Sequence, residues 1–280
     1  MKFAVIKGDL IRLIHHLIFL LHGLLTYNLV FDADFSSFFE AKGEENCWEM
    51  ALFQCFMILA TKNNLGMTPV RWKVAQYFEK RWWTNYLRGK EADEYFKWKQ
   101  NYWHNFLNEI SNWAKPLQSH SFLDMGCGPA GIFMVLPGKV TAVDPLIDQY
   151  KLKLPFFIPE KFENVHFLAS SAESFQCQTQ FDFVFSLNVI NHVSDIKLAV
   201  ETLYACCKTG GNLVLSIDSH NYKFLRTVFR YLHFDILHPH QLTLNEYIYL
   251  LEEAGFTIKG EKCLKKGLVF DYVVLVAEKL

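Results

Sequence analysis

Short apolar runs rich in β-branched and aromatic residues alternate with helical stretches from Ser121 to the end of the chain. These runs lie at 121–126, 140–145, 164–170, 181–188, 211–218, 255–264 and 268–279. The alternation is typical of a parallel sheet that is covered by helices on both faces. Lys265, Lys266 and Gly267 alone separate the last two runs, which is too little chain for a crossover helix. The sequence therefore predicts an α/β fold in which one strand runs antiparallel to the rest.

The composition narrows the class of protein further. Of the 280 residues, 51% are hydrophobic and 20% are charged, which excludes a disordered or collagen-like chain. The net charge of −1 gives no bulk attraction for nucleic acid, so no nucleic-acid partner is expected. The seven cysteines form no C-x-x-C pair and no Cys/His metal spacing, so we expect neither a disulfide scaffold nor a metal site. A reducing cytoplasm is the expected compartment.

Three segments of different composition predict the domain organisation. Residues 1–66 form an apolar, helical appended segment, 67–118 an aromatic-rich helical cap, and 119–280 the α/β domain. Within the first segment, residues 10–31 are long enough to span a bilayer but are interrupted by charged and polar side chains. We expect a helix that packs on the rest of the protein, with a membrane anchor as the alternative.

The cap segment has an unusual aromatic content. Six of the seven tryptophans lie within 67–113, and Tyr95, Trp98, Tyr102 and Phe106 recur at helical spacing. This pattern predicts one or two amphipathic helices with an aromatic face. That face either packs on the following domain or covers a ligand pocket.

A glycine-rich turn follows the first predicted strand. Gly126, Gly128 and Gly131 form a G-x-G-x-x-G pattern, and glycines at such a turn let the backbone approach a ligand closely. We expect the N-terminus of a helix behind this turn. Asp144 ends the next strand, where a carboxylate can accept hydrogen bonds from both hydroxyls of a ribose.

Two cofactor classes share this geometry. The glycine pattern matches a dinucleotide site, which would make the protein an NAD(P)-dependent oxidoreductase. Asp124, two residues before the first glycine, favours the other class, because a carboxylate there repels a pyrophosphate but suits an ammonium group. S-adenosylmethionine carries a ribose and an α-ammonium group and no phosphate.

The ordered motifs resemble those of the class I S-adenosylmethionine-dependent methyltransferases. They are FLDMGCGPAG, VTAVDP, SSAESF, FDFVFSLNVINHV and KTGGNLVLSID, and the resemblance covers about residues 121–280. It implies a Rossmann-like sheet of seven strands in the order 3-2-1-4-5-7-6, with strand 7 antiparallel. It also implies S-adenosylmethionine as the cofactor and methyl transfer as the activity. A methyltransferase-like protein that binds without turnover is a further alternative.

The resemblance assigns roles to particular residues. It implies that Asp124 and the Gly126–Cys127–Gly128 turn bind the methionine end of the cofactor, and that Asp144 with Pro145 binds its ribose. It further implies that Ser171 and Ala172 contact adenine and that Asn188 lies beside the transferring methyl group. Ser171 stands where the family usually has an acidic residue, and Glu173 is the alternative adenine ligand.

Histidines supply the candidate general base. His192 follows the fourth strand, so it could take a proton from the acceptor, although it could also only cap a loop. His238 and His240 lie where the family often lines its acceptor site, or they form a surface turn. We expect a small, partly apolar acceptor in a cavity lined by His192 and at least one aromatic residue from 72–106.

Overall fold

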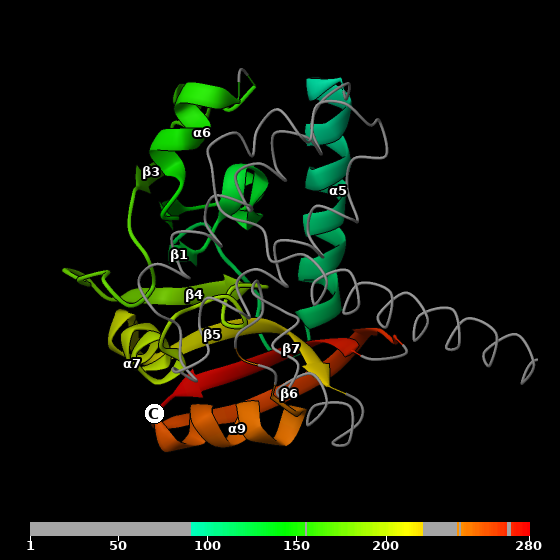
Figure 1. The fold of residues 1–280 in the computed structure, drawn as a ribbon, viewed down its shortest axis with the longest axis vertical. Coiled ribbons are helices and arrows are strands. Elements are labelled where there is room, and N and C mark those ends of the chain that lie inside the picture. The colour runs from blue at the N-terminus through cyan, green and yellow to red at the C-terminus, as the bar shows by residue number, and fades with distance from the viewer. Residues whose placement is uncertain (1–90, 155, 221–239, 241, 268–269) are drawn as a thin grey trace, which may run out of the picture. The chain divides into compact units, whose positions relative to one another are not determined.

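The computed structural model describes residues 91–154, 156–220, 240, 242–267 and 270–280 (Figure 1). These residues form a seven-stranded sheet in the order β3-β2-β1-β4-β5-β7-β6. Its strands are β1 (Ser121–Met125), β2 (Lys139–Val143), β3 (Val165–Leu168), β4 (Phe181–Leu187), β5 (Cys207–His220), β6 (Phe256–Lys265) and β7 (Phe270–Lys279). Strands β1 to β5 pair in parallel, whereas β7 is antiparallel to both β5 and β6. The predicted strand order and the antiparallel strand are confirmed.

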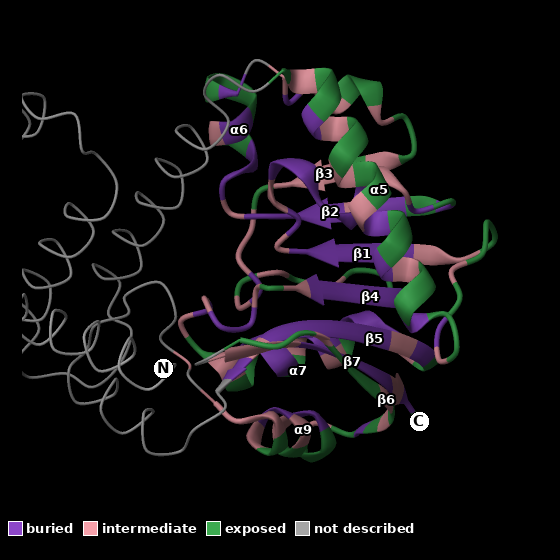
Figure 2. Cartoon of the chain, turned by 90° about the vertical axis from the view of Figure 1, so that its right-hand side faces the viewer, coloured by how far each residue is buried: buried purple, intermediate pink, exposed green. Residues whose placement is uncertain are grey.

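Helices cover both faces of the sheet, as Figure 2 shows. The α-helices in the described part are α5 (Ala92–Ile110), α6 (Ile147–Lys153), α7 (Ile196–Cys206) and α9 (Leu244–Glu253). One core cluster joins α5 and α6 to one face, and a second joins α7 and α9 to the other. The parallel strands are therefore buried on both sides, which explains why their sequences are almost continuously apolar.

Helix α5 belongs to the aromatic segment that the sequence singled out. Its side chains Tyr95, Trp103 and Phe106 are buried in the core cluster, and the indole Nε1 of Trp103 donates to the carbonyl of Ala130 at 3.0 Å. Trp98 contacts the rings of Tyr95 and Tyr102 but is itself 52% exposed. The aromatic face of α5 therefore packs on the α/β domain.

The chain after the glycine-rich turn departs from the sequence prediction. Instead of a long helix, two short 3-10 helices follow, η1 (Gly128–Ala130) and η2 (Ile132–Met134). Pro137 and Gly138 then lead directly into β2 at Lys139. The expected helix N-terminus behind the turn is therefore wrong. The backbone of η2 is held instead by Asp124, whose Oδ2 accepts from the Phe133 amide at 3.0 Å.

Several predictions fall on residues outside the described part. These are the appended segment 1–66, its apolar stretch 10–31, the tryptophans before residue 91, and His238. All described residues belong to one compact unit. Among them, no helix has both the length and the apolar character needed to cross a membrane.

Candidate functional site

A cleft lies at the edge of the sheet where the parallel strands end. The arrowheads of β1, β2 and β4 point to this edge in Figure 2. The cleft lies where the strand order reverses between β1 and β4, which is the position at which open α/β sheets bind ligands. It is lined by Gly126, Asp144, Pro145, Ser170, Ser171, Ala172, Glu173, Asn188, Val189, His192 and Val193.

The turn after β1 forms the floor of the cleft. Gly126 has a φ of 72° and Gly128 a φ of 58°, a backbone conformation that favours glycine. A Cβ atom built on Gly126 would lie 2.2 Å from Cγ2 of Val189. Glycine is required here both by the backbone angle and by the close approach of the loop after β4.

Asp144 is 4% exposed and points back toward the glycine-rich turn. Its Oδ2 accepts from the Gly128 amide at 3.0 Å, and its Oδ1 accepts from the Leu146 amide at 2.8 Å. Burial raises the pKa of this carboxyl to about 6, although these hydrogen bonds act in the opposite direction. Because a carboxylate offers about four acceptor sites, Asp144 can bridge the turn and still accept from a ligand hydroxyl.

Asp124 lies behind the turn and is 2% exposed. Burial, together with the nearby negative charge of Asp144, raises the pKa of its carboxyl to about 7, although the hydrogen bond from the Phe133 amide acts in the opposite direction. Two acidic groups thus share one apolar, water-excluded region. A ligand with a positive charge would favour the ionised form of both, because an opposite charge lowers the pKa of a carboxyl group.

Three of the predicted site residues do not line the cleft. Asp124, Cys127 and Gly128 lie behind the Gly126 floor, and the Cys127 side chain is buried. Burial raises the pKa of the Cys127 thiol well above its usual value, so this cysteine is not a thiolate. The structure brings the other predicted residues onto the cleft, which are Gly126, Asp144, Pro145, Ser171, Ala172, Asn188 and His192.

The loop after β3 faces the loop after β4 across the cleft. Ser171 and Ala172 come from the first loop, and Asn188 and His192 come from the second. Glu173 ties the two loops together, because its Oε1 accepts from the Ser194 hydroxyl at 2.7 Å and also from the Ser194 amide. This oxygen is therefore engaged in holding the loops, a role that the sequence pattern did not indicate.

The described aromatic residues do not cover the cleft. No residue of α5 is among the described residues that line it. Residues 72–90 lie outside the described part, so an aromatic residue from 72–106 in the acceptor cavity stays a prediction. Sequence reasoning also missed Ser170, Val189 and Val193. Small polar and branched apolar residues carry no signal for a site, and only the folded loops bring these three together.

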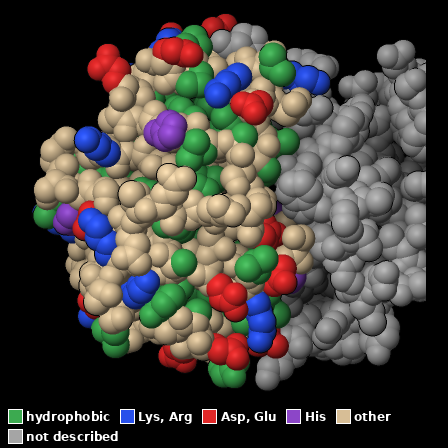
Figure 3. All heavy atoms as spheres, turned by 90° about the vertical axis from the view of Figure 1, so that its left-hand side faces the viewer, with side chains coloured by type: hydrophobic (Ala, Val, Ile, Leu, Met, Phe, Trp, Pro, Cys, Tyr) green, Lys and Arg blue, Asp and Glu red, His purple; other side chains and the backbone are tan. Residues whose placement is uncertain are grey.

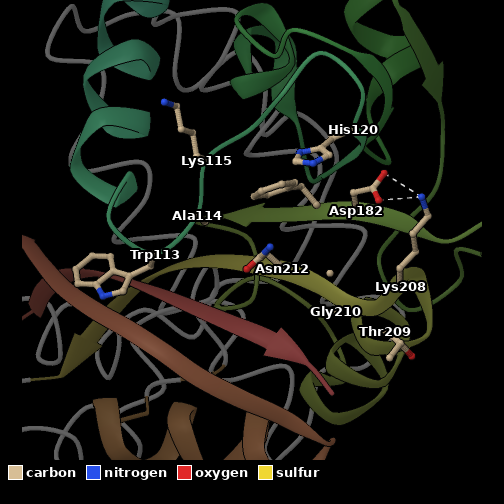
Figure 4. A pocket seen from close by; sticks show the side chains of 11 residues that line it. Trp113, Ala114, Lys115, His120, Asp182, Lys208, Thr209, Gly210 and Asn212 are labelled. Atoms are coloured by element: carbon tan, nitrogen blue, oxygen red, sulfur yellow. Dashed lines mark hydrogen bonds and ion pairs between the residues drawn. The ribbon is translucent and has the colours of Figure 1, made fainter.

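A second cavity of about 220 Å³ lies at the opposite edge, where the parallel strands begin (Figure 4). Its lining includes the ion pair between Asp182 and Lys208, with Oδ2 and Nζ 2.9 Å apart. Asn212 and Trp113 also line it. None of the predicted site residues lies there. Among the described residues, no group of three or more His, Cys, Asp or Glu side chains could hold a metal ion.

Comparison with known proteins decides the family. The family model of a methyltransferase domain matches residues 95–259, which is more than half of the chain and includes the whole cleft. The chain belongs to the S-adenosylmethionine-dependent methyltransferases. The resemblance in the motifs is thereby confirmed, and the dinucleotide interpretation of the glycine pattern is set aside.

Individual relatives of this methyltransferase are distant. The Ubiquinone biosynthesis O-methyltransferase of Nitrobacter winogradskyi is 27% identical over 105 residues, which cover 36% of this chain and 40% of that protein. The aligned stretch thus spans less than half of that relative.

Solved structures share the fold. A SAM-dependent methyltransferase from Thermotoga maritima matches with a TM-score of 0.53 and 19% identity, over 74% of this chain and 100% of that one. The [4+2]-cyclase SpnF matches with a TM-score of 0.50 and 14% identity, over 62% and 80% of the two chains. At these identities the likeness concerns the fold alone.

The residues of the cleft fit S-adenosylmethionine, the cofactor of this family. The Asp144 carboxylate in the lining suits its ribose hydroxyls, and the Gly126 turn gives the close backbone approach that a bound ligand needs. The charge of Asp124, which is buried next to the turn and outside the lining, suits a positive group. The enclosed part of the cleft measures about 80 Å³, below the roughly 300 Å³ at which ligand pockets begin. A cofactor bound there would therefore extend beyond this volume.

Proposed function

We propose that this protein transfers the methyl group of S-adenosylmethionine to a small-molecule acceptor. The observation that carries the proposal is the position of Asp144. This buried carboxylate ends β2, bridges the Gly126–Gly128 turn, and faces a cleft at the carboxyl edge of the sheet. The family match supplies the cofactor, and the cleft supplies the place for it.

Each loop at the cleft has its own part in holding the cofactor. Asp144 with Pro145 binds the ribose, because the carboxylate accepts from its hydroxyls. Asp124 acts on the methionine end through its charge, without lining the cleft, and the Gly126–Cys127–Gly128 turn holds that end through the backbone at Gly126. These assignments rest on the burial, spacing and orientation described above.

The remaining contacts come from the loops after β3 and β4. Ser171 and Ala172 contact adenine, since both line the cleft and follow β3, which pairs with the strand that ends just before Asp144. Asn188 lies beside the methionine moiety and the methyl group.

Positioning supplies most of the rate enhancement in this proposal. S-adenosylmethionine, when bound, presents a methyl group on a positively charged sulfur. An acceptor atom held in line with that methyl group would take it, and the sulfur would keep the electron pair of the broken bond. Alignment of the two atoms is worth on the order of 7–11 kcal/mol. His192, on the rim of the cleft, takes the acceptor proton, which contributes roughly 10²–10⁴-fold.

Charge and relatives favour a small acceptor. Lys and Arg side chains are interspersed with Asp and Glu on the face shown in Figure 3, where no basic stripe for nucleic acid is present in the described part. The distant relative from Nitrobacter is named as an O-methyltransferase of ubiquinone biosynthesis, which favours a hydroxyl acceptor on a small molecule. The five described cysteines are free thiols, which fits the reducing cytoplasm.

Thermal unfolding with added ligands tests the proposal. S-adenosylhomocysteine should raise the midpoint of unfolding, because a ligand that binds only the folded state stabilises it. NADH at the same concentration should leave the midpoint unchanged. Protection by NADH and none by S-adenosylhomocysteine would contradict the proposal and support a dinucleotide site.

A further inference from the structure

Asn188 adopts a backbone conformation that is uncommon for a residue with a side chain. Its φ is 59°, in the left-handed region, and it is the only non-glycine residue of the described part with a positive φ. The residue follows β4 directly and lines the cleft. Asparagine tolerates this conformation better than most residues, but the conformation persists only when surrounding contacts hold it.

The contacts that hold Asn188 come from the neighbouring strand β5. Its amide donates to the carbonyl of Ser216 at 3.1 Å and to the Oγ of the same serine at 2.9 Å. The first is the hydrogen bond expected where β4 and β5 pair in parallel. The second is a side-chain contact that ordinary strand pairing does not supply, and Ser216 is fully buried.

A second hydroxyl supports the serine from the next strand. The hydroxyl of Tyr272, on β7, lies 2.8 Å from the Oγ of Ser216 and donates to it. Burial raises the pKa of Tyr272, so its hydroxyl keeps its proton and stays a donor. A serine oxygen has two acceptor sites, and Asn188 and Tyr272 fill both. The hydrogen bonds thus run from β7 through β5 to the edge of β4.

Neither hydroxyl lines the cleft itself. Ser216 and Tyr272 are absent from the cleft lining, whereas Asn188 is part of it. Any effect of these two hydroxyls on a ligand must therefore pass through the placement of Asn188.

We propose that Ser216 and Tyr272 are positioning residues that hold Asn188 in the left-handed conformation needed to contact the methionine end of the cofactor. This inference rests on the proposed function, because it takes the ligand to be S-adenosylmethionine. It gives a role to two residues, Ser216 and Tyr272, to which the motifs of the sequence assign none. It also predicts which end of the ligand depends on them.

Two ligands that differ at the methionine end test the inference. S-adenosylhomocysteine carries the amino-acid portion, and 5′-methylthioadenosine carries the same nucleoside and sulfur without it. Ser216→Ala removes the side-chain acceptor of the Asn188 amide, and Tyr272→Phe removes only the supporting hydroxyl. Ser186→Ala is the matched control, because Ser186 is also buried and its Oγ has no hydrogen-bond partner within the described part of the chain.

Calorimetry on the full chain should show a selective loss. Ser216→Ala should weaken binding of S-adenosylhomocysteine about threefold to tenfold, as expected for one lost hydrogen bond, and Tyr272→Phe about threefold. Both variants should bind 5′-methylthioadenosine like the parent protein, and Ser186→Ala should bind both ligands normally.

The other outcomes separate the two proposals. An equal loss for both ligands would mean a general distortion and would overturn the positioning role. Unchanged affinity of both Ser216→Ala and Tyr272→Phe for S-adenosylhomocysteine would overturn it too. If the unmodified protein bound neither ligand, the proposed function itself would fail, and the positioning role with it.

Discussion

Replacement of Asp144 by asparagine removes its charge and one acceptor oxygen while nearly keeping its shape. The carboxylate accepts from the amides of Gly128 and Leu146, so an alanine would leave both donors without their partner. Asparagine has nearly the same shape and keeps one acceptor oxygen for one of these amides. It replaces the other oxygen by a donor, which cannot accept from a ribose hydroxyl.

The size of the effect follows from the burial of Asp144. A hydrogen bond to a charged group contributes about 1.5–3 kcal/mol, so the Asp144→Asn variant should bind S-adenosylhomocysteine about tenfold to a hundredfold more weakly. Titration calorimetry measures the affinity, and thermal unfolding shows whether the variant is folded. Asp182→Asn is a control at the opposite edge of the sheet and should bind normally. A folded Asp144→Asn variant with unchanged affinity would refute the ribose assignment.

Four further predictions concern pH, catalysis and domain structure. Burial raises the pKa of Asp124 to about 7 and that of Asp144 to about 6, so both carboxyls become ionised as the pH rises. The affinity for S-adenosylhomocysteine in calorimetry should therefore increase from about pH 5.5 to about pH 8. An affinity that does not change with pH would count against an interaction between these carboxylates and the ligand's positive charge. The same raised pKa values should make the free energy of unfolding decrease as the pH rises from about 4 to about 7, because the folded protein there binds more protons than the unfolded chain. In denaturant titrations, Asp124→Asn should make this decrease smaller. His192→Gln should keep the affinity for S-adenosylhomocysteine and lower methyl transfer to an identified acceptor by roughly 10²–10⁴-fold; an unchanged rate would leave His192 no role as a base. A chain that starts at Met67 should bind S-adenosylhomocysteine as the full chain does, and an insoluble product would show that residues 1–66 complete the core.

The strands could be predicted because their signal is local. Each strand is a short apolar run that ends at a glycine, proline or polar residue, and the observed β1 at Ser121–Met125 and β4 at Phe181–Leu187 differ from the predicted ranges by one residue. The hairpin of β6 and β7 followed from the shortness of its connection. The strand order came from the family resemblance.

The site was harder to predict where the outcome depends on packing between distant segments. Helical spacing predicted the aromatic helix. It could not show that the Trp103 indole would donate a hydrogen bond to the carbonyl of Ala130 instead of facing a ligand. The spacing of Glu173 from Ser171 suggested an adenine contact, yet its Oε1 is held by Ser194, 21 residues later. The glycine pattern predicted the turn but not the two 3-10 helices after it. One of these helices is held by a hydrogen bond from the Phe133 amide to the Asp124 side chain, nine residues earlier.

A crystal structure of the full chain with S-adenosylhomocysteine bound tests the central claim most directly. The account predicts that the ribose hydroxyls lie within hydrogen-bond distance of Asp144 and that the amino-acid portion lies over the Gly126 turn beside Asn188. It also predicts that His192 faces the side of the sulfur from which the methyl group leaves. Binding in the cavity beside Asp182 and Lys208, or a ribose with no contact to Asp144, would contradict it.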